Sequence, residues 1–424
     1  MSTVVGRRAR DPFVDVLRTC AILVVAGGHW IMPVLARHGA TLTAGNSLTT
    51  PGWWLLTWPL QVMPVFFFAG GAANHYSFAA TGRQDPRRWL STRLCRLAVP
   101  VLPLLAVWLV LPSLLRDVGV PAQPVALASG IVGQLLWFLA VYVLTIVAVP
   151  LTRRWGLPMV GVLGVGALVV DGLRLNGVPL VGYLNEVLVW VAVSLLGAAY
   201  ARGELRPSRR AAMTMGIAGF AGTALLVLFR HYPDSMVGLP GQAMSNMAPA
   251  TTCLLTLGIG QIGVLLALRE RILRRAARPG PAKALRAVGS RCMTVYLWHL
   301  PALVVVAGVA VLGFGYATPA PGSGLWLVVT PLWIGALATT LALPVRLFGR
   351  LEAVRVTGDA PATLRLAVAV PLLCAGCAGL AAFGFADTLV ALGWSAAVVV
   401  GLCLAWPAGL TVRWLATAVD TVFR

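Results

Sequence analysis

The sequence predicts an all-α protein, a polytopic transmembrane helix bundle with about twelve spans. Apolar residues make up 59% of the 424 residues and charged residues only 11%, whereas about 25% are charged in a typical soluble domain. Apolar runs of about 18 residues or more recur along the whole length, and each is long enough to cross a bilayer as a helix. No polar stretch is large enough to form a soluble domain of its own.

The expected spans, in chain order, cover residues 13–34, 54–76, 97–115, 131–150, 157–171, 184–200, 211–229, 248–268, 293–314, 325–345, 366–385 and 389–411. The segments that join them are short. The longest, residues 269–292, is rich in arginine and contains Pro279-Gly280-Pro281. It predicts a basic helical extension, a break and a short interfacial segment leading into the ninth span.

Basic residues alternate between the two ends of the spans. One side of the predicted bundle collects 28 of the 33 lysines and arginines and the other collects four, while Arg18 lies within the first span. The positive-inside rule places the richer side, with both termini, in the cytoplasm. This arrangement explains the net charge of +20 without a nucleic-acid partner. The lipid bilayer is therefore the first expected partner.

The first span carries two costly residues, Arg18 and His29, which lie eleven positions apart. Eleven residues at about 100° each return to nearly the same helix face, about 16 Å further along the axis. Asp15 falls near that face, where it either orients Arg18 or is simply an interfacial residue. An ionisable group inside a span usually faces the protein interior and marks a function or a partner.

The second span begins with Trp53, Trp54 and Trp58, as expected for an aromatic belt at the membrane surface. Further along, the pair Gly70-Gly71 suits close contact between helices. The following cytoplasmic segment ends with Arg93 and Arg96, neighbours at i and i+3 on a helix. Paired guanidinium groups suit a phosphate-rich ligand, although positive-inside anchoring would give the same pattern.

The ninth span contains His299, about seven residues in from the cytoplasmic side, so we expect it nearer the level of Arg18 than of His29. A lone buried histidine is more often structural than catalytic, but two with a buried arginine favour chemistry. The cysteines lie mostly within spans, and the pair Cys374-x-x-Cys377 occupies an apolar helix. There cysteine behaves as a small hydrophobic residue, so we expect no disulfide framework and no metal site.

Five motifs occur in order over roughly residues 11–350. They are Asp15-x-Leu17-Arg18 followed by His29, Phe66-Phe67-Phe68 with Gly70-Gly71, Arg93-x-x-Arg96 with Pro100, Leu136-Trp137-Phe138-Leu139, and Tyr296-Leu297-Trp298-His299. Together they resemble the acyltransferase-3 family of integral-membrane acyltransferases. One departure is Phe67-Phe68-Ala-Gly-Gly-Ala-Ala-Asn74, where family members often read Phe-Phe-x-x-Ser-Gly-Phe. It suggests a divergent subgroup.

The resemblance implies an O-acyltransferase that moves an acyl group, expected to be acetyl, to a hydroxyl of a glycan, glycolipid or secondary metabolite. Acyl-CoA would be the donor substrate, and no permanently bound cofactor is expected. The catalytic candidates are His29 as general base, Arg18 on the developing negative charge, and His299 lining the site. Arg93 and Arg96 would bind the CoA phosphates.

The same resemblance implies two parts in the chain. Residues 11–350 would form a ten-helix acyltransferase core, and residues 351–424 would add two helices and a short cytoplasmic tail. The excess of arginine over lysine and the richness in alanine and glycine favour a GC-rich bacterial genome. We therefore expect an integral protein of the bacterial plasma membrane that acts on the cell envelope or on a metabolite.

One alternative function stays open, and the outer polar residues have two possible interpretations. A transporter or flippase would also combine twelve spans with buried charge, although no two-half symmetry is visible. On the outer side, six polar residues could shape access for the acceptor or could be solvated loop ends: Asp171, Arg174, Asn185, Glu186, His231 and Asp234.

The arginine alternation predicts that residue 280 faces the cytoplasm. In a variant without its native cysteines, a cysteine introduced as Gly280→Cys should resist a membrane-impermeant thiol reagent in intact cells and react after the cells are opened. Labelling of intact cells would contradict this topology.

Overall fold

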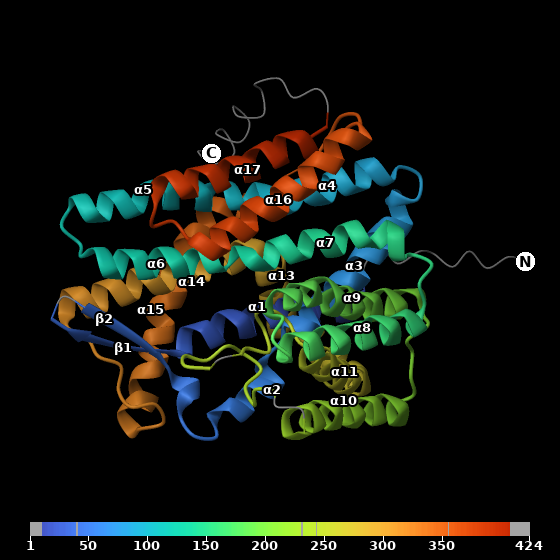
Figure 1. Ribbon diagram of the computed structural model, residues 1–424, viewed down its shortest axis with the longest axis horizontal. Coiled ribbons are helices and arrows are strands. Elements are labelled where there is room, and N and C mark those ends of the chain that lie inside the picture. The colour runs from blue at the N-terminus through green and yellow to red at the C-terminus, as the bar shows by residue number, and fades with distance from the viewer. Residues whose placement is uncertain (1–10, 40, 230–231, 243, 355, 408–424) are drawn as a thin grey trace, which may run out of the picture. The chain divides into compact units, whose positions relative to one another are not determined.

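The computed structural model describes residues 11–39, 41–229, 232–242, 244–354 and 356–407 (Figure 1). Within these residues, eleven helices are long and apolar enough to cross a membrane. A twelfth candidate is the bent pair of α11 (Thr252–Ala267) and α12 (Arg269–Ala276), which meet at 64°. Each of the twelve expected spans corresponds to one of these candidates, so the predicted helical bundle is confirmed; the last part of the twelfth expected span, residues 408–411, lies outside the described residues.

The chain forms two compact units. Among the described residues, unit 1 comprises those up to Ile22, Gly52–Trp89 and Leu144–Gly289, and unit 2 comprises Leu23–Pro51, Leu90–Val143 and those from Ser290 onward. Unit 1 contains α2 (Thr57–Leu60), α3 (Met63–Ser77), α8 (Leu157–Leu175), α9 (Asn185–Arg202), α10 (Arg209–Phe229), α11, α12 and α13 (Pro279–Gly289). Unit 2 contains β1 (Pro33–His38), β2 (Thr41–Asn46), α5 (Leu102–Asp117), α6 (Ala122–Gln134), α14 (Cys292–Gly308), α15 (Gly324–Phe348), α16 (Thr363–Phe383) and α17 (Thr388–Ala405). Three helices contribute to both: α1 (Pro12–Ile31), α4 (Pro86–Ala98) and α7 (Leu136–Thr152).

The core of unit 1 depends on glycines that let α3 and α9 touch. A Cβ on Gly71 would lie 2.1 Å from the carbonyl oxygen of Ser194, and one on Gly197 would meet the carbonyl oxygen of Phe68. Apolar side chains gain little from packing against each other in lipid, so small residues that bring backbones together stabilise the helix pair. The ring of Phe67 stacks on Trp190 of α9, with centroids 4.4 Å apart.

A polar cluster fixes the start of α1 in unit 1. Tyr200 donates a hydrogen bond of 2.8 Å to Oδ2 of Asp11 and accepts one of 2.9 Å from Nε of Arg269. Arg269 also lies 3.7 Å from Asp11 and over the ring of Phe13. The predicted basic extension is thus helix α12, its break precedes Pro279, and the following segment is α13.

The outer polar residues of unit 1 form a buried network. The Asp171 carboxylate is fully buried and accepts hydrogen bonds from Asn185, from the hydroxyl of Tyr232 and from the backbone N–H of Thr252. Burial, with this carboxylate nearby, raises the pKa of Tyr232. A solvated loop end does not fit these contacts, because Asn185 joins α9 to α8, while Tyr232 and Thr252 tie the connection between α10 and α11, and the start of α11, to Asp171.

Other members of the polar set act on the same connection. Glu186 accepts hydrogen bonds from Trp190 and from the backbone of Ala250, while Arg174 donates to the carbonyl of Pro249. His231 lies outside the described residues. These contacts indicate a role in holding the connection in place.

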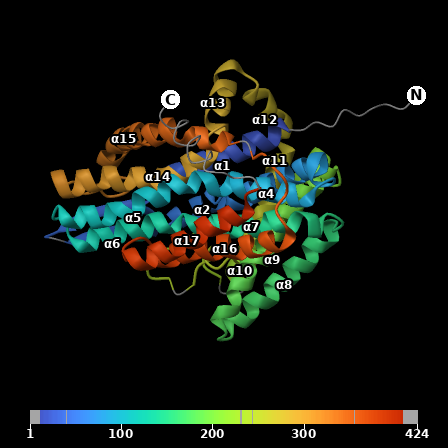
Figure 2. The ribbon, with the colours of Figure 1, turned by 90° about the horizontal axis from the view of Figure 1, so that it is seen from above.

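In unit 2, α14 runs alongside α6, and the last two helices pack on the same group (Figure 2). A Cβ on Gly133 of α6 would lie 2.4 Å from the carbonyl oxygen of Leu380, so α6 and α16 are in backbone contact. Helix α17 packs against α5 (Figure 1). Helices α16 and α17 are therefore an integral part of unit 2.

A β-hairpin that the helical pattern did not predict follows α1. Strands β1 and β2 are antiparallel, with Pro33 opposite Asn46. Proline cannot continue the preceding helix, and Leu35 and Leu42 are buried against Val311. The backbone of Leu35 also accepts a hydrogen bond from the N–H of Thr318, which joins the hairpin to the segment after α14.

The contact between α3 and α9 predicts the effect of adding one methyl group. Gly71→Ala should destabilise the protein by about 1–3 kcal/mol, because the added atom overlaps backbone that cannot move aside easily. Gly161→Ala on α8 is the matched control, since a Cβ there meets nothing within 4 Å, and alanine favours a helix. Thermal unfolding in detergent measures both variants. Equal midpoints would contradict the close approach.

Candidate active site

Two histidines from distant parts of the sequence meet in unit 2. Nδ1 of His29 on α1 lies 2.8 Å from Nε2 of His299 on α14. The ring planes differ by only 3° and the centroids are 5.1 Å apart. This is the geometry of two coplanar imidazoles joined edge to edge by an N–H···N bond, because face-to-face rings would have their nitrogen atoms further apart. The His299 side chain is fully buried.

The surroundings of His299 determine which nitrogens carry protons. Its Nδ1 lies 2.6 Å from the carbonyl oxygen of Tyr296, and a carbonyl only accepts, so Nδ1 carries the hydrogen. In a neutral ring Nε2 is then an acceptor. Nδ1 of His29 must therefore donate to it. This leaves Nε2 of His29 as the unprotonated nitrogen, the one able to accept a proton from another molecule.

Residues of two sequence motifs hold His299 in this arrangement. The hydroxyl of Tyr296 donates a hydrogen bond of 2.8 Å to the carbonyl of Leu135, at the junction of α6 and α7. Phe138 of α7 packs on the Tyr296 ring, with centroids 5.0 Å apart. Tyr296 in turn packs against His299. The two motifs therefore work together to fix the turn of α14 that carries His299.

A carboxylate from a later segment caps α14. Oε1 of Glu352 accepts hydrogen bonds from the backbone N–H and the hydroxyl of Thr294, and Oε2 accepts one from the N–H of Met293. A negative charge at a helix N-terminus satisfies free N–H groups and interacts favourably with the helix dipole. Sequence reasoning missed Glu352. The only signal was an acidic residue among arginines at the end of a span.

Trp30 connects the histidine pair to an open pocket. Its ring nitrogen donates to the carbonyl of His299, and its own carbonyl accepts from Nε1 of Trp333. The enclosed space of this pocket is about 20 Å³, and the rest of the hollow is open to solvent. Its lining is largely aromatic and proline, with two threonines: Trp30, Ile31, Pro33, Tyr316, Thr318, Pro319, Trp326, Val329, Thr330 and Trp333. Such walls favour a flat, partly apolar ligand with hydroxyl groups.

The sequence-based depth of His299 is wrong. Counting residues placed it nearer to Arg18, whereas its ring bonds to His29. The count assumes that every span stands upright and begins at the same plane. Helices in a bundle tilt, and packing against their neighbours sets where they cross.

Arg18 lies on the part of α1 that belongs to unit 1. It forms an ion pair of 3.8 Å with Asp15, and both side chains are partly exposed. A pair this long and this exposed contributes little stability. Nε of Arg18 is buried, and among the described residues none accepts a hydrogen bond from it. Asp15 thus contacts Arg18 only through this long ion pair, and Nε of Arg18 has no acceptor among the described residues.

Arg93 and Arg96 lie one turn apart on α4, where it leads through Pro100 into α5. Arg93 is half-buried and Arg96 is exposed, while Leu94 and Cys95 between them are fully buried. Both guanidinium groups belong to the part of α4 that lies in unit 2. The structure thus brings His29 and His299 into contact and leaves the arginine pair on a separate helix.

Comparison with known proteins gives one result that bears on these residues. None of the curated proteins and none of the solved structures compared with the chain matched it. A family model described as an acyltransferase domain matches residues 11–350. That range contains the histidine pair and all five sequence motifs. The chain belongs to the acyltransferase-3 family, and it is a membrane acyltransferase.

Proposed function

We propose that this acyltransferase moves an acyl group, expected to be acetyl, from acyl-CoA to a hydroxyl of a glycan, glycolipid or secondary metabolite. The observation that carries the proposal is the hydrogen bond from His29 to His299, because it leaves a basic nitrogen on His29. The arginine alternation supports a plasma-membrane protein with both termini in the cytoplasm. A bacterial source is an expectation from composition alone.

In the proposed step, Nε2 of His29 accepts the proton of the acceptor hydroxyl as its oxygen attacks the thioester carbonyl carbon. The new C–O bond forms, the C–S bond breaks, and the proton passes from His29 to the departing CoA sulfur. His299 is a positioning residue here: it accepts the Nδ1–H bond, holds the ring and stabilises the imidazolium by its ring dipole. Arg18 would supply a hydrogen bond to negative charge on the donor.

The aromatic pocket beside Trp30 is the place we propose for the acceptor. Aromatic rings and two threonine hydroxyls suit the apolar face and the polar edge of a sugar-like ring. The pocket contains residues from the end of α1 and from the segment after α14, which the arginine alternation assigns to the outer side. These features support an acceptor that reaches His29 from that side.

Family membership favours acyl transfer over the transporter alternative, and a single assay separates them. Purified full-length protein is mixed with labelled acetyl-CoA and a cell-envelope or metabolite extract, and the products are analysed by mass. The wild type should form an acylated product. His29→Ala should lower the rate by about 10²–10⁴-fold while acyl-CoA still binds. Full transfer by this variant would contradict the mechanism, and no acylated product from the wild type would contradict the enzyme class.

The positioning role of His299 makes a separate prediction. His299→Leu removes the acceptor for the Nδ1–H of His29, so kcat should fall, by less than in His29→Ala, while the KM for acyl-CoA stays unchanged. His299→Gln should restore part of kcat, since its amide can both accept from His29 and donate to Tyr296. Steady-state kinetics of the two variants provide the check. A loss that glutamine does not relieve would indicate a purely structural role.

If Arg93 and Arg96 hold the CoA phosphates, the double variant Arg93→Ala/Arg96→Ala should bind acyl-CoA more weakly by roughly 1–3 kcal/mol for each bond lost. Arg87→Ala/Arg88→Ala is the matched control, because these exposed residues lie on the same helix. Equilibrium binding of acyl-CoA to both proteins measures the difference. Equal affinities would leave Arg93 and Arg96 as topology anchors only.

A further inference from the structure

Helix α16 meets α6 through its backbone at two points. A Cβ on Gly133 of α6 would lie 2.4 Å from the carbonyl oxygen of Leu380. A Cβ on Gly384, which follows α16, would lie 3.0 Å from the carbonyl oxygen of Ser129. Gly384 also has a φ of +67°, a conformation that residues with a Cβ rarely adopt. Neither glycine can therefore gain a side chain without moving one helix away from the other.

This close approach lies next to the junction of α6 and α7. Leu135 is the one residue between the two helices, and Gly133 precedes it by two positions, about 3 Å along the helix axis. The carbonyl of Leu135 is the group that accepts the hydrogen bond from the hydroxyl of Tyr296 on α14. Both views show α6 between α16 and α14 (Figure 1, Figure 2). The two helices therefore hold the same short stretch of α6 from either side.

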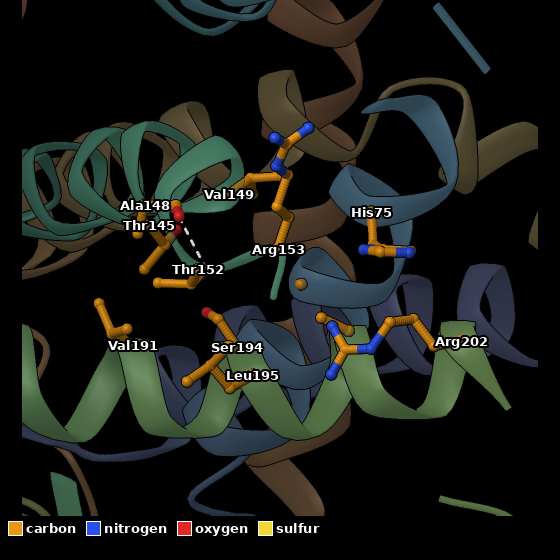
Figure 3. A pocket seen from close by; sticks show the side chains of 12 residues that line it. His75, Thr145, Ala148, Val149, Thr152, Arg153, Val191, Ser194, Leu195 and Arg202 are labelled. Atoms are coloured by element: carbon orange, nitrogen blue, oxygen red, sulfur yellow. Dashed lines mark hydrogen bonds between the residues drawn. The ribbon is translucent and has the colours of Figure 1, made fainter. Parts of the chain in front are cut away.

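The two halves of α7 are packed differently. In unit 1 its C-terminal half lines an open hollow with α3 and α9 (Figure 3), and the enclosed space there is only about 20 Å³. In unit 2, residues 138–141 of α7 are buried. Sγ of Cys374 on α16 lies 3.5 Å from the carbonyl oxygen of Ala140, to which it donates. Helix α16 thus packs against α7 at the end that carries Phe138, the residue in contact with Tyr296.

Other contacts hold α16 itself in place. A Cβ on Gly379 would lie 2.2 Å from the ring of Trp394, so α16 and α17 are in direct contact. Directly after Gly384, the ring of Phe385 packs on Trp108 of α5, with centroids 6.2 Å apart. Because α5 and α17 fix it in this way, α16 is a firm support for the junction of α6 and α7.

We propose that α16 is a positioning element of the active site. It fixes α6 at Gly133, and α6 presents the carbonyl of Leu135 to the hydroxyl of Tyr296. Tyr296 then orients the turn that carries His299, which makes Gly133 a positioning residue. This inference rests on the proposed function, in which the histidine pair performs the transfer. The support comes from outside the matched acyltransferase domain, which ends at residue 350.

The size of the overlap sets the expected effect. Ordinary contacts of a Cβ are 3.4–4 Å long, so Gly133→Ala must separate α6 from α16 by about 1 Å. Misplacing a group at an active site by that distance can cost about 10²-fold in rate. We expect kcat to fall about tenfold, with the KM for acetyl-CoA unchanged. Gly130→Ala on the same helix is the matched control, because a Cβ there meets nothing within 4 Å.

A double-mutant cycle with Tyr296→Phe tests the route. This substitution removes the hydroxyl that bonds to Leu135, so kcat should fall. Adding Gly133→Ala to the Tyr296→Phe protein should lower kcat by about twofold or less, because the link through which Gly133 acts is already broken. Full-length proteins are compared by steady-state kinetics with labelled acetyl-CoA and an extract that supports transfer by the wild type. Thermal unfolding in detergent shows that each variant is folded.

The outcomes separate this inference from the proposed function. Equal losses of kcat on adding Gly133→Ala to the wild type and to Tyr296→Phe would show that α16 supports the fold in general. Unchanged kcat in Gly133→Ala or in Tyr296→Phe, with His29→Ala inactive, would overturn the inference and leave the proposed function standing. Full transfer by His29→Ala would contradict the proposed function and the inference with it.

A milder variant serves if Gly133→Ala does not fold. Cys374→Ala removes only a side-chain contact with α7, and Cys403→Ala, an exposed cysteine on α17, is its control. Cys374→Ala should lower kcat in the wild type and leave it unchanged in Tyr296→Phe. An equal effect in both proteins, or no effect in either, would overturn the inference.

Discussion

The hydrogen bond between His29 and His299 is the interaction on which the rest of this account depends. Each neutral imidazole has one donor nitrogen and one acceptor nitrogen. Fixing the protonated nitrogen of one ring therefore fixes which ring donates in the bond between them. The carbonyl of Tyr296 fixes that nitrogen by accepting the Nδ1–H of His299. His299 therefore accepts through Nε2, His29 donates through Nδ1, and Nε2 of His29 carries no hydrogen. The Tyr296 carbonyl, His299 and His29 together leave Nε2 of His29 as the nitrogen that can accept a proton.

Several contacts in unit 2 hold the Tyr296 carbonyl, His299 and His29 in this hydrogen-bonded arrangement. Glu352 caps the start of α14, and the hydroxyl of Tyr296 fixes its first turns to the junction of α6 and α7. Trp30 bonds to the carbonyl of His299 itself. Buried polar groups are costly unless every one is satisfied, and each of these contacts satisfies a donor that would otherwise be orphaned. The helices around α14 therefore constrain the histidine pair as well as bury it.

The sequence could predict the features that depend on local pattern. Length and hydropathy give the spans, and the period of the helix places Arg18 and His29 on one face of α1. The small residues of the second span correctly indicated a close helix contact, made at Gly71. The basic segment before α14 divides into two helices as predicted, but Pro279, Gly280 and Pro281 form the first turn of α13 and the break lies just before them.

The sequence pattern could not predict the features that depend on tertiary packing. The partner of His29 lies 270 positions away, and a residue count of depth assumes that every helix stands upright and begins at the same plane. Glu352 acts on α14 only because the chain returns after α15. The outer carboxylate Asp171 looks like a loop residue in the sequence, yet three donors surround it in a fully buried position. The residues next to His299, Glu352 and Asp171 in the sequence do not indicate which distant groups these side chains contact.

The most direct test of the central claim is the protonation state of the two rings themselves. Solid-state nitrogen-15 NMR of the membrane-embedded protein with labelled histidine reports which ring nitrogen carries hydrogen, and His29→Gln and His299→Gln variants assign the signals. This account predicts that both rings are neutral and protonated on Nδ1, with Nε2 of His29 bare. A His29 ring protonated on Nε2 and bare on Nδ1 would reverse the bond and contradict its role as the base.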